Sequence, residues 1–249
     1  MEAWGVPLAA FAGSFVAGYL GAAVGLVLGT LRLPLLLVLA GSPSAGAGAN
    51  IAISAAAAAS GGLQHARAGR VDRRVVLWMA PPSVAGAVLG GLYGERLPER
   101  ALLAGVAAVL AWQGVDLLAR PFHERSRPRP RLVPAAVFGV AIGAVGGALG
   151  VILGTLRLPA LLRAVGLPAA KAVGTNLVVG FFLGVAGFAA HAARLDVEWG
   201  LLAPGLAGAL PGAWLGARVT PRLSDQALRR AIGVTLLAIA AAFVAELFA

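Results

Sequence analysis

The sequence is dominated by apolar runs that are each about as long as a membrane-spanning helix. Read between the charged residues, the runs cover about residues 5–23, 25–41, 45–64, 75–94, 99–119, 132–150, 151–167, 170–190, 198–217 and 226–247. A helix needs about 20 apolar residues to cross a bilayer. The runs are continuous and do not alternate, which favours helices over a strand barrel. The pattern therefore predicts an all-α polytopic membrane protein.

The composition excludes several classes of protein. Only 12% of the residues are charged and none is cysteine, whereas an ordinary soluble domain has about 25% charged residues. Without cysteine, the chain has no disulfides, thiolate metal sites or cysteine nucleophiles. The formal net charge of +10 first suggests an acidic partner such as nucleic acid. The positions of the basic residues give that charge a different meaning.

An internal duplication divides the chain. Residues 29–34 read Gly-Thr-Leu-Arg-Leu-Pro, and the same six residues return at positions 154–159. Collinear matches follow at a spacing one residue longer, including Asn50 with Asn176 and Gly90 with Gly216. A segment rich in proline and arginine, residues 120–131, separates the two copies. We therefore expect a first transmembrane repeat at 1–119, a linker at 120–131 and a second repeat at 132–249.

The basic residues indicate that the two repeats are inverted, because lysine and arginine gather in cytoplasmic loops. The loop after the third run contains Arg67, Arg70, Arg73 and Arg74. The matching loop of the second repeat contains only Arg194. In the other two pairs of equivalent loops, the excess of basic residues also lies on opposite sides in the two repeats. Five crossings per repeat then place the N- and C-termini outside and the linker in the cytoplasm. Most basic residues set this topology, so we expect no nucleic-acid partner.

Arg32 and Arg157 do not fall in loops, because each lies in the second apolar run of its repeat. Each is flanked by a glycine and a proline, which are Gly29 and Pro34 in the first repeat and Gly154 and Pro159 in the second. Proline tends to break a helix. We therefore expect each second span to consist of two half-helices that meet at these residues. Broken helices at corresponding positions of two repeats indicate a transport site.

Two arginines at membrane depth require negative charge, since each costs about 2.5–3.5 kcal/mol on insertion scales. No aspartate or glutamate lies at a comparable depth, and Asp116 and Glu246 lie near span ends. The guanidinium group offers paired donors to oxyanions. The sequence thus predicts that Arg32 and Arg157 bind a small anionic substrate. The alternative is that they extend to an interface or bind backbone carbonyls at the breaks.

Neutral polar residues near the breaks are candidates for further substrate contacts. These residues are Thr30, Asn50, Thr155, Thr175 and Asn176. For the two asparagines the alternative is a structural role, because asparagine often joins helices inside membranes.

The segments around the two hexapeptides resemble the TauE/SafE sulfite exporters, also called the TSUP family. The similar segments are residues 25–34, residues 147–159, Gly-Leu-Pro at 166–168, Ala-Val-Gly-Thr-Asn at 172–176 and the loop at 191–199. Two features depart from the family. Its run of three glycines is reduced to Gly29 and Gly154, and the positions of Arg32 and Arg157 are more often apolar in the family. The resemblance implies transport of sulfite, thiosulfate, sulfonates or related organic anions across the cytoplasmic membrane.

Together these features predict a secondary transporter for a small sulfur-containing or organic anion that works by alternating access. Export is favoured, because an inside-negative potential assists anion exit by about 2.3 kcal/mol per charge per 100 mV. A channel or facilitator, or an importer coupled to protons or sodium, remains open. The three histidines are dispersed, so we expect no enzyme, metal site or cofactor. The expected partners are the substrate, the lipid bilayer and a proton, a sodium ion or no coupling ion. The oligomeric state is not indicated.

Overall fold

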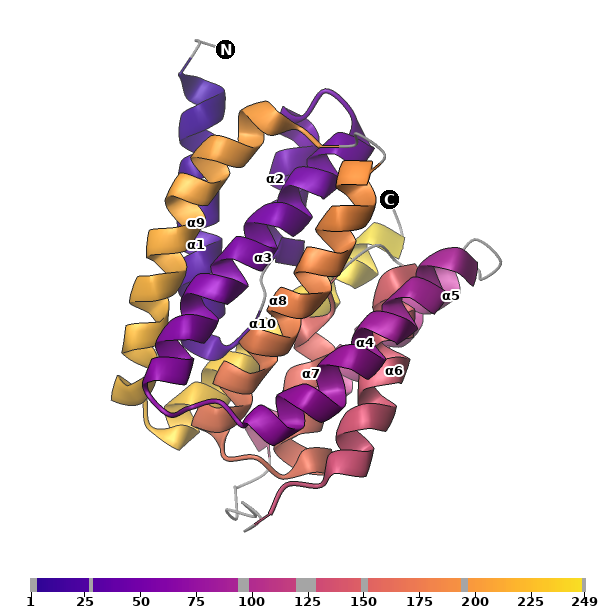
Figure 1. Ribbon diagram of the computed structural model, residues 1–249, viewed down its shortest axis with the longest axis vertical. Helices are drawn as coiled ribbons and strands as arrows, with labels where there is room; N and C mark the ends of the chain where they lie inside the picture. Colours follow the sequence, from indigo (N-terminus) through magenta and orange to yellow (C-terminus); the bar gives the residue numbers. More distant parts are fainter. Residues whose placement is uncertain are drawn as a thin grey trace. The chain divides into compact units, whose positions relative to one another are not determined.

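The computed structural model describes residues 4–26, 29–93, 99–119, 129–148, 152–193 and 197–247 (Figure 1). These residues form helices and contain no strand, so the prediction of an all-α protein is confirmed. The helices are α1 (Gly5–Val24), α2 (Gly29–Leu39), α3 (Pro43–Arg67), α4 (Arg73–Tyr93), α5 (Glu99–Ala119), α6 (Leu132–Ala148), α7 (Gly154–Ala160), α8 (Ala169–Ala193), α9 (Trp199–Val219) and α10 (Asp225–Leu247). A π-helical turn, η2 (Leu161–Val165), follows α7, and a 3-10 turn, η3 (Thr220–Arg222), follows α9.

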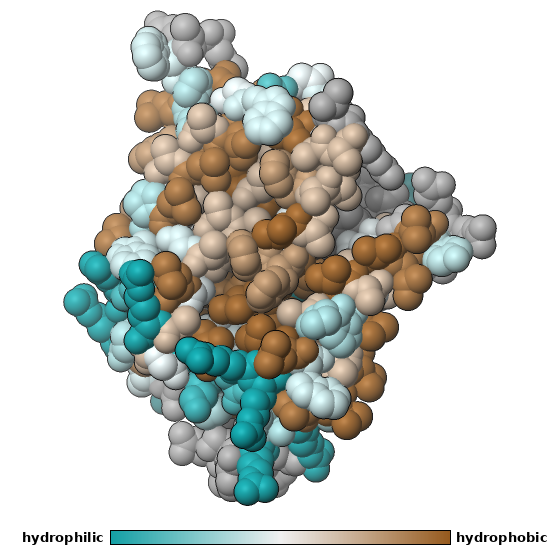
Figure 2. Space-filling model, in the orientation of Figure 1, coloured by the Kyte–Doolittle hydropathy of each residue, from teal (hydrophilic) through white to brown (hydrophobic). Residues whose placement is uncertain are grey.

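The helices have the length and surface of a membrane protein. Four segments of the described chain are long and apolar enough to cross a membrane, namely Gly5–Val24, Ala169–Ala190, Trp199–Arg222 and Gln226–Ala245. Large apolar side chains point outward, and Leu8, Leu77 and Val133 are 67%, 70% and 67% exposed. Figure 2 shows such side chains over much of the visible face. Water penalises an apolar surface of this extent, whereas lipid does not.

The helices group into two compact units. The first unit is Met1–Val71 with Val173–Thr220, and it contains α1, α2, α3, most of α8, and α9. The second unit is Asp72–Ala172 with Pro221–Ala249, and it contains α4 to α7 and α10. Each unit therefore combines helices from both predicted repeats. Residues 120–128 of the predicted linker lie outside the described part of the chain.

In the first unit, α1 and α9 pack backbone to backbone. A Cβ atom added to Gly212 would lie 3.1 Å from the carbonyl carbon of Phe15, and one added to Gly216 would lie 2.8 Å from that of Tyr19. The contacts advance along both helices together, so α1 and α9 run in the same direction. Small residues allow membrane helices to approach this closely.

In the second unit, α4 and α6 pack in the same way. A Cβ added to Gly86 would lie 3.0 Å from the carbonyl carbon of Val140, and one added to Gly90 would lie 2.7 Å from that of Ala144. Each position is equivalent, at the offset of the sequence repeat, to a position in the α1–α9 contact. The first helix of one repeat thus packs on the fourth helix of the other in both units, with the same register.

The third helices of the two repeats, α3 and α8, contact one another within the first unit. A Cβ added to Gly61 would lie 3.3 Å from Leu177 Cδ1, and one added to Gly187 would lie 3.3 Å from Ile51 Cγ2. The two glycines are repeat equivalents, and so are Ile51 and Leu177. The helices are antiparallel here, because the higher-numbered residue of one meets the lower-numbered residue of the other. Reciprocal contacts of this kind, in which each helix presents the equivalent glycine to the equivalent apolar residue of the other, are typical of elements related by a local two-fold axis.

The second span of each repeat contains a short helix that is preceded by non-helical backbone. Helix α1 ends at Val24 and is followed by Gly25, whose φ of 75° is left-handed, and α2 begins at Gly29. Residues 152–153 are not helical, and α7 begins at Gly154. Of the four residues predicted to mark the breaks, Gly29 and Gly154 are the first residues of α2 and α7, and Pro34 and Pro159 lie inside these helices. That two half-helices meet at these residues stays a prediction.

Pro159 is the penultimate residue of α7, just before the π-helical turn η2 begins. Pro159 lacks an N–H group, so it cannot donate the helical hydrogen bond to the carbonyl of Thr155. The chain then continues as the wider π turn η2, in which the N–H of Gly166 donates to the carbonyl of Leu161 at 3.1 Å. Local widening of this kind lets a helix continue past an irregularity.

Candidate functional site

Arg32 lies near the middle of the first unit and its side chain points toward α3. It is only 3% exposed. Nε donates to Oδ1 of Asn50 at 3.0 Å, and Nη2 donates to the backbone oxygen of Asn50 at 3.0 Å and to Oγ of Ser54 at 2.8 Å. The other terminal nitrogen, Nη1, donates to none of the described residues. Arg32 is therefore a buried cation whose hydrogen-bond partners in the described chain are all neutral.

The position of Arg32 along the bundle follows from the course of α2. Leu35, one turn further along α2, lies against Gly13 near the middle of α1, where its Cδ2 would be 2.5 Å from an added Cβ. Leu36 joins the core cluster that contains Ala10 of α1. Helix α2 thus runs back along α1 from its middle toward its start. Because α1 is long enough to span a membrane, Arg32 lies near mid-depth of that helix.

Two local features of the sequence bring Arg32 to its partners. Asn50 and Ser54 are four residues apart on α3, so they share one face of that helix. Gly29 lets α2 approach this face, because an added Cβ would clash with Oγ of Ser54 and lie 3.4 Å from Nδ2 of Asn50. The sequence analysis missed Ser54. The spacing of four residues between Asn50 and Ser54 could have indicated it. Its equivalent in the second repeat is Gly180, so a comparison of the two repeats did not identify it as a shared polar position.

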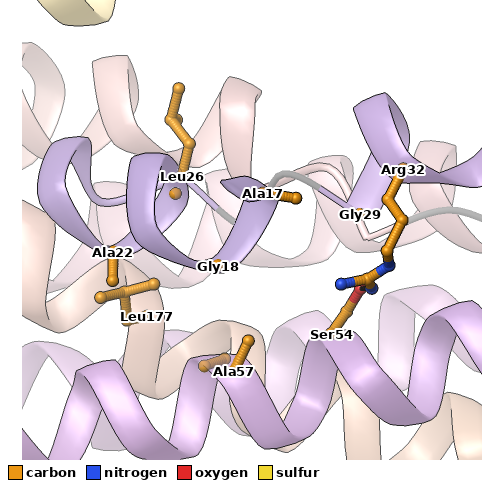
Figure 3. Close-up of a pocket in the computed structure, with 11 residues that line it drawn as sticks. Ala17, Gly18, Ala22, Leu26, Gly29, Arg32, Ser54, Ala57 and Leu177 are labelled. Carbon is orange, nitrogen blue, oxygen red and sulfur yellow. Dashed lines mark hydrogen bonds between the residues drawn. The ribbon is translucent and has the colours of Figure 1, made fainter. Parts of the chain in front are cut away.

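A small cavity lies beside Arg32 in the first unit (Figure 3). Arg32 and Ser54 form its polar end, where the guanidinium group points toward the hydroxyl group. The other lining residues are small or apolar, namely Ala17, Gly18, Gly21, Ala22, Leu26, Gly29, Ala57, Ala58 and Leu177. The free volume is about 10 Å³, which is at the lower limit for one water molecule. An anion with several oxygens needs this cavity to widen.

The remaining predicted site residues belong to both compact units. Thr30 lies in α2, but its side chain is outside the described part of the structure. Arg157 and Thr155 belong to the second unit, and each is 1% exposed. Thr175 and Asn176 are fully buried in the part of α8 that belongs to the first unit. The structure thus brings Arg32 and Asn50 together and adds Ser54 to them.

Asn176 contacts the turn that follows α1. Its Nδ2 donates to the backbone oxygen of Gly25 at 2.7 Å. The adjacent Val173 packs on the same glycine, since a Cβ added to Gly25 would lie 2.6 Å from Cα of Val173. Asn176 and Val173 therefore hold the turn that follows α1. This contact is the helix-joining role that asparagine often has inside membranes.

The second unit contains a separate buried ion pair. Nη2 of Arg163, in η2, contacts Oδ2 of Asp116, in α5. Asp116 is buried and Arg163 is partly exposed. Within the described residues, no three histidine, aspartate or glutamate side chains gather as metal ligands.

Comparison with known proteins gives a consistent result. Residues 10–243 match the family described as sulfite exporter TauE/SafE. A probable membrane transporter protein of Xylella fastidiosa (strain Temecula1 / ATCC 700964) is 28% identical over 236 residues, which cover 90% of this chain and 90% of that protein. The probable membrane transporter protein YtnM of Bacillus subtilis (strain 168) is 27% identical over 216 residues, which cover 80% of this chain and 71% of that protein. No solved structure matches the chain.

The family match spans almost the whole chain and includes both second spans with their short helices. The relatives that cover most of the chain are named as membrane transporters. The apolar outer surface described above requires the same membrane environment. This chain is a membrane transporter that belongs to the TauE/SafE sulfite exporter family.

Proposed function

We propose that this transporter moves a small sulfur-containing or organic anion across the cytoplasmic membrane. Sulfite, thiosulfate and a sulfonate such as sulfoacetate are the candidate substrates. The observation that carries the proposal is the Arg32 cluster. A buried guanidinium group is held by Asn50 and Ser54, which are neutral, and it lines a cavity. A cation in this setting attracts an oxyanion, and its planar donors suit oxygens of tetrahedral or pyramidal groups.

The proposed substrate-binding residues are Arg32, Asn50, Thr30, Arg157, Thr155, Thr175 and Asn176, to which Ser54 is added. Arg32 supplies the charge, and the hydroxyl of Ser54 supplies a donor at the cavity. Thr155 is a further candidate in the second unit, because its buried Oγ1 has no hydrogen-bond partner among the described residues. We assign the chain no catalytic role and no cofactor.

We further propose an inverted arrangement of the repeats and transport by alternating access. Inversion requires the first helix of one repeat to run in the same direction as the fourth helix of the other, and the contacts of α1 with α9 and of α4 with α6 have this direction. The antiparallel, reciprocal contact of α3 with α8 also supports inversion. The proposed topology has both termini outside and the linker at 120–131 in the cytoplasm. The narrow cavity fits a carrier that must rearrange to admit substrate.

Export is the proposed direction. The membrane potential assists anion exit by about 2.3 kcal/mol per charge per 100 mV, so export needs no coupling ion. An importer of the same anion would need a proton or sodium gradient. Uptake of labelled anion into proteoliposomes, with and without each gradient, separates the two directions. Accumulation that depends on a gradient contradicts export. Saturable counterflow of labelled anion identifies a carrier, and its absence identifies a channel or facilitator.

Thermal unfolding of the purified chain with sulfite, thiosulfate, sulfoacetate or acetate tests the site itself. A ligand that binds the folded state raises the melting temperature. We expect one of the sulfur anions to stabilise the wild type, Arg32→Lys to weaken this effect, and Arg32→Ala to abolish it. Arg100→Ala removes an exposed arginine of α5 and is the control for net charge. Stabilisation that persists unchanged in a folded Arg32→Ala variant contradicts the proposed site.

A further inference from the structure

Two arginines lie over one tryptophan at the end of the first unit where α3 and α9 finish, and a third contacts the adjacent turn of α9. Cζ of Arg67 lies 5.4 Å from the ring centroid of Trp214, and Cζ of Arg218 lies at the same distance. Both distances are within the range of cation–π attraction. Arg70 reaches the same turn of α9, where its Nη2 donates to the backbone oxygen of Ala217 at 3.2 Å. We call Arg67, Arg70, Arg218 and Trp214 the tryptophan–arginine cluster.

The charges of the cluster are not balanced by the described residues. Both guanidinium groups carry a positive charge beside the same ring. None of the three arginines forms an ion pair within the described chain. In addition, Nε and Nη1 of Arg70 are buried and have no hydrogen-bond partner there. Unpaired buried donors are costly, so the cluster lacks an anionic acceptor.

The helix termini explain only part of this arrangement. Arg67 and Arg218 lie in the last turns of α3 and α9, where the helix dipole favours positive charge. The dipole accounts for each arginine separately. It does not account for the convergence of both on one ring, nor for the unpaired donors of Arg70.

The surroundings identify the missing anion. Arg67 and Arg218 are exposed and Trp214 is half-buried, at the end of helices whose sides are covered by apolar side chains. Hydrophilic side chains gather at this end of α3 and α9 in Figure 2. Tryptophan is enriched where a membrane meets water. Arginines at that level attract anionic lipids, and basic pockets between membrane helices bind lipid head groups.

We propose that the tryptophan–arginine cluster binds the phosphodiester head group of an anionic phospholipid. Arg67 and Arg218 hold the phosphate oxygens between them, and Trp214 keeps the two guanidinium groups in place. Arg70, which contacts the same turn of α9, adds positive charge beside them. The acyl chains lie along the apolar sides of α3 and α9. This site is separate from the cavity at Arg32 and does not depend on which substrate is transported.

Native mass spectrometry of the full chain with phosphatidylglycerol or phosphatidylcholine tests the proposal. We expect the wild type to retain phosphatidylglycerol, and the double variant Arg67→Gln/Arg218→Gln to bind it at least about tenfold more weakly. The matched control is Arg100→Gln/Arg230→Gln, which removes the same charge from exposed arginines of the second unit and is expected to retain the lipid. A third variant, Arg67→Lys/Arg218→Lys, keeps the charge and is expected to recover part of the binding even if the glutamine pair folds poorly.

Three results overturn the proposal. The first is equal loss of phosphatidylglycerol from the glutamine pair and the control pair, because the attraction is then general. The second is equal retention of phosphatidylcholine by the wild type. The third is thermal stabilisation by inorganic phosphate as large as that by phosphatidylglycerol, because the site then takes a free anion and not a lipid.

Discussion

Replacing Gly216 with alanine tests whether α1 and α9 touch backbone to backbone. An added Cβ would clash with the carbonyl oxygen of Tyr19 and lie 2.8 Å from its carbonyl carbon. Carbon atoms in favourable contact are about 3.5–4.0 Å apart, so the two helices must separate by a fraction of an ångström or more. Overpacking of this kind costs about 1–3 kcal/mol.

A matched glycine isolates this steric cost. Gly105 lies in α5, is exposed, and has nothing within 4 Å of an added Cβ. Alanine is favoured over glycine in a helix by about 0.8–1.0 kcal/mol, and this gain is common to both substitutions. The Gly105→Ala variant should therefore be slightly more stable than the wild type. The Gly216→Ala variant should be less stable than Gly105→Ala by the steric cost alone, about 1–3 kcal/mol.

The assay is thermal unfolding of each purified variant in one detergent, followed by intrinsic fluorescence. For a chain of this size 1 kcal/mol shifts the melting temperature by about 2–4 °C, so the two variants should differ by about 2–12 °C. Gly90→Ala should behave like Gly216→Ala, because its added Cβ would lie 2.7 Å from the carbonyl carbon of Ala144 in the equivalent contact of the second unit. Equal melting temperatures for Gly105→Ala and Gly216→Ala refute the close approach of α1 and α9.

Three further substitutions test other parts of the first unit by the same unfolding assay. Gly25→Ala should lower the melting temperature well below that of the wild type, because φ is 75° and an added Cβ would lie 2.6 Å from Cα of Val173; an unchanged value contradicts the left-handed turn. Ser54→Ala should lower the free energy of unfolding by about 1–3 kcal/mol, since it removes the 2.8 Å acceptor of Arg32, and anion-induced stabilisation should shrink with it. Ser14→Ala should leave the free energy of unfolding unchanged or raise it by about 1 kcal/mol, because the fully buried Ser14 hydroxyl has no partner among the described residues. A lower melting temperature contradicts this reasoning, because it shows that the hydroxyl makes a stabilising hydrogen bond.

The existence of the helices could be read from the sequence because it depends on local properties. The apolar run at 5–23 became α1, Gly5–Val24, and the run at 226–247 became α10, Asp225–Leu247. The length of an apolar run and the membrane thickness set these bounds. The repeat offset also predicted which glycines are equivalent, and those glycines make equivalent contacts in both units.

The site was only partly predictable. Arg32 and Asn50 were expected to lie together, and they do. Ser54 was missed because the second repeat has Gly180 at that position. The breaks were assigned to Gly29, Pro34, Gly154 and Pro159; the two glycines begin α2 and α7, whereas the two prolines lie within these helices.

By itself, therefore, the sequence determined that the chain is a helical membrane protein with two related halves and a buried arginine in each. These properties follow from hydrophobic length, charge and internal identity, which can be read residue by residue. Only the tertiary structure decided that each compact unit draws helices from both halves, that Asn50 and Ser54 accept hydrogen bonds from Arg32, and that Asn176 donates to the backbone of Gly25. The physical reason is that a side chain takes its partner from the helix packed against it, and that helix is chosen by contacts between residues far apart in the chain.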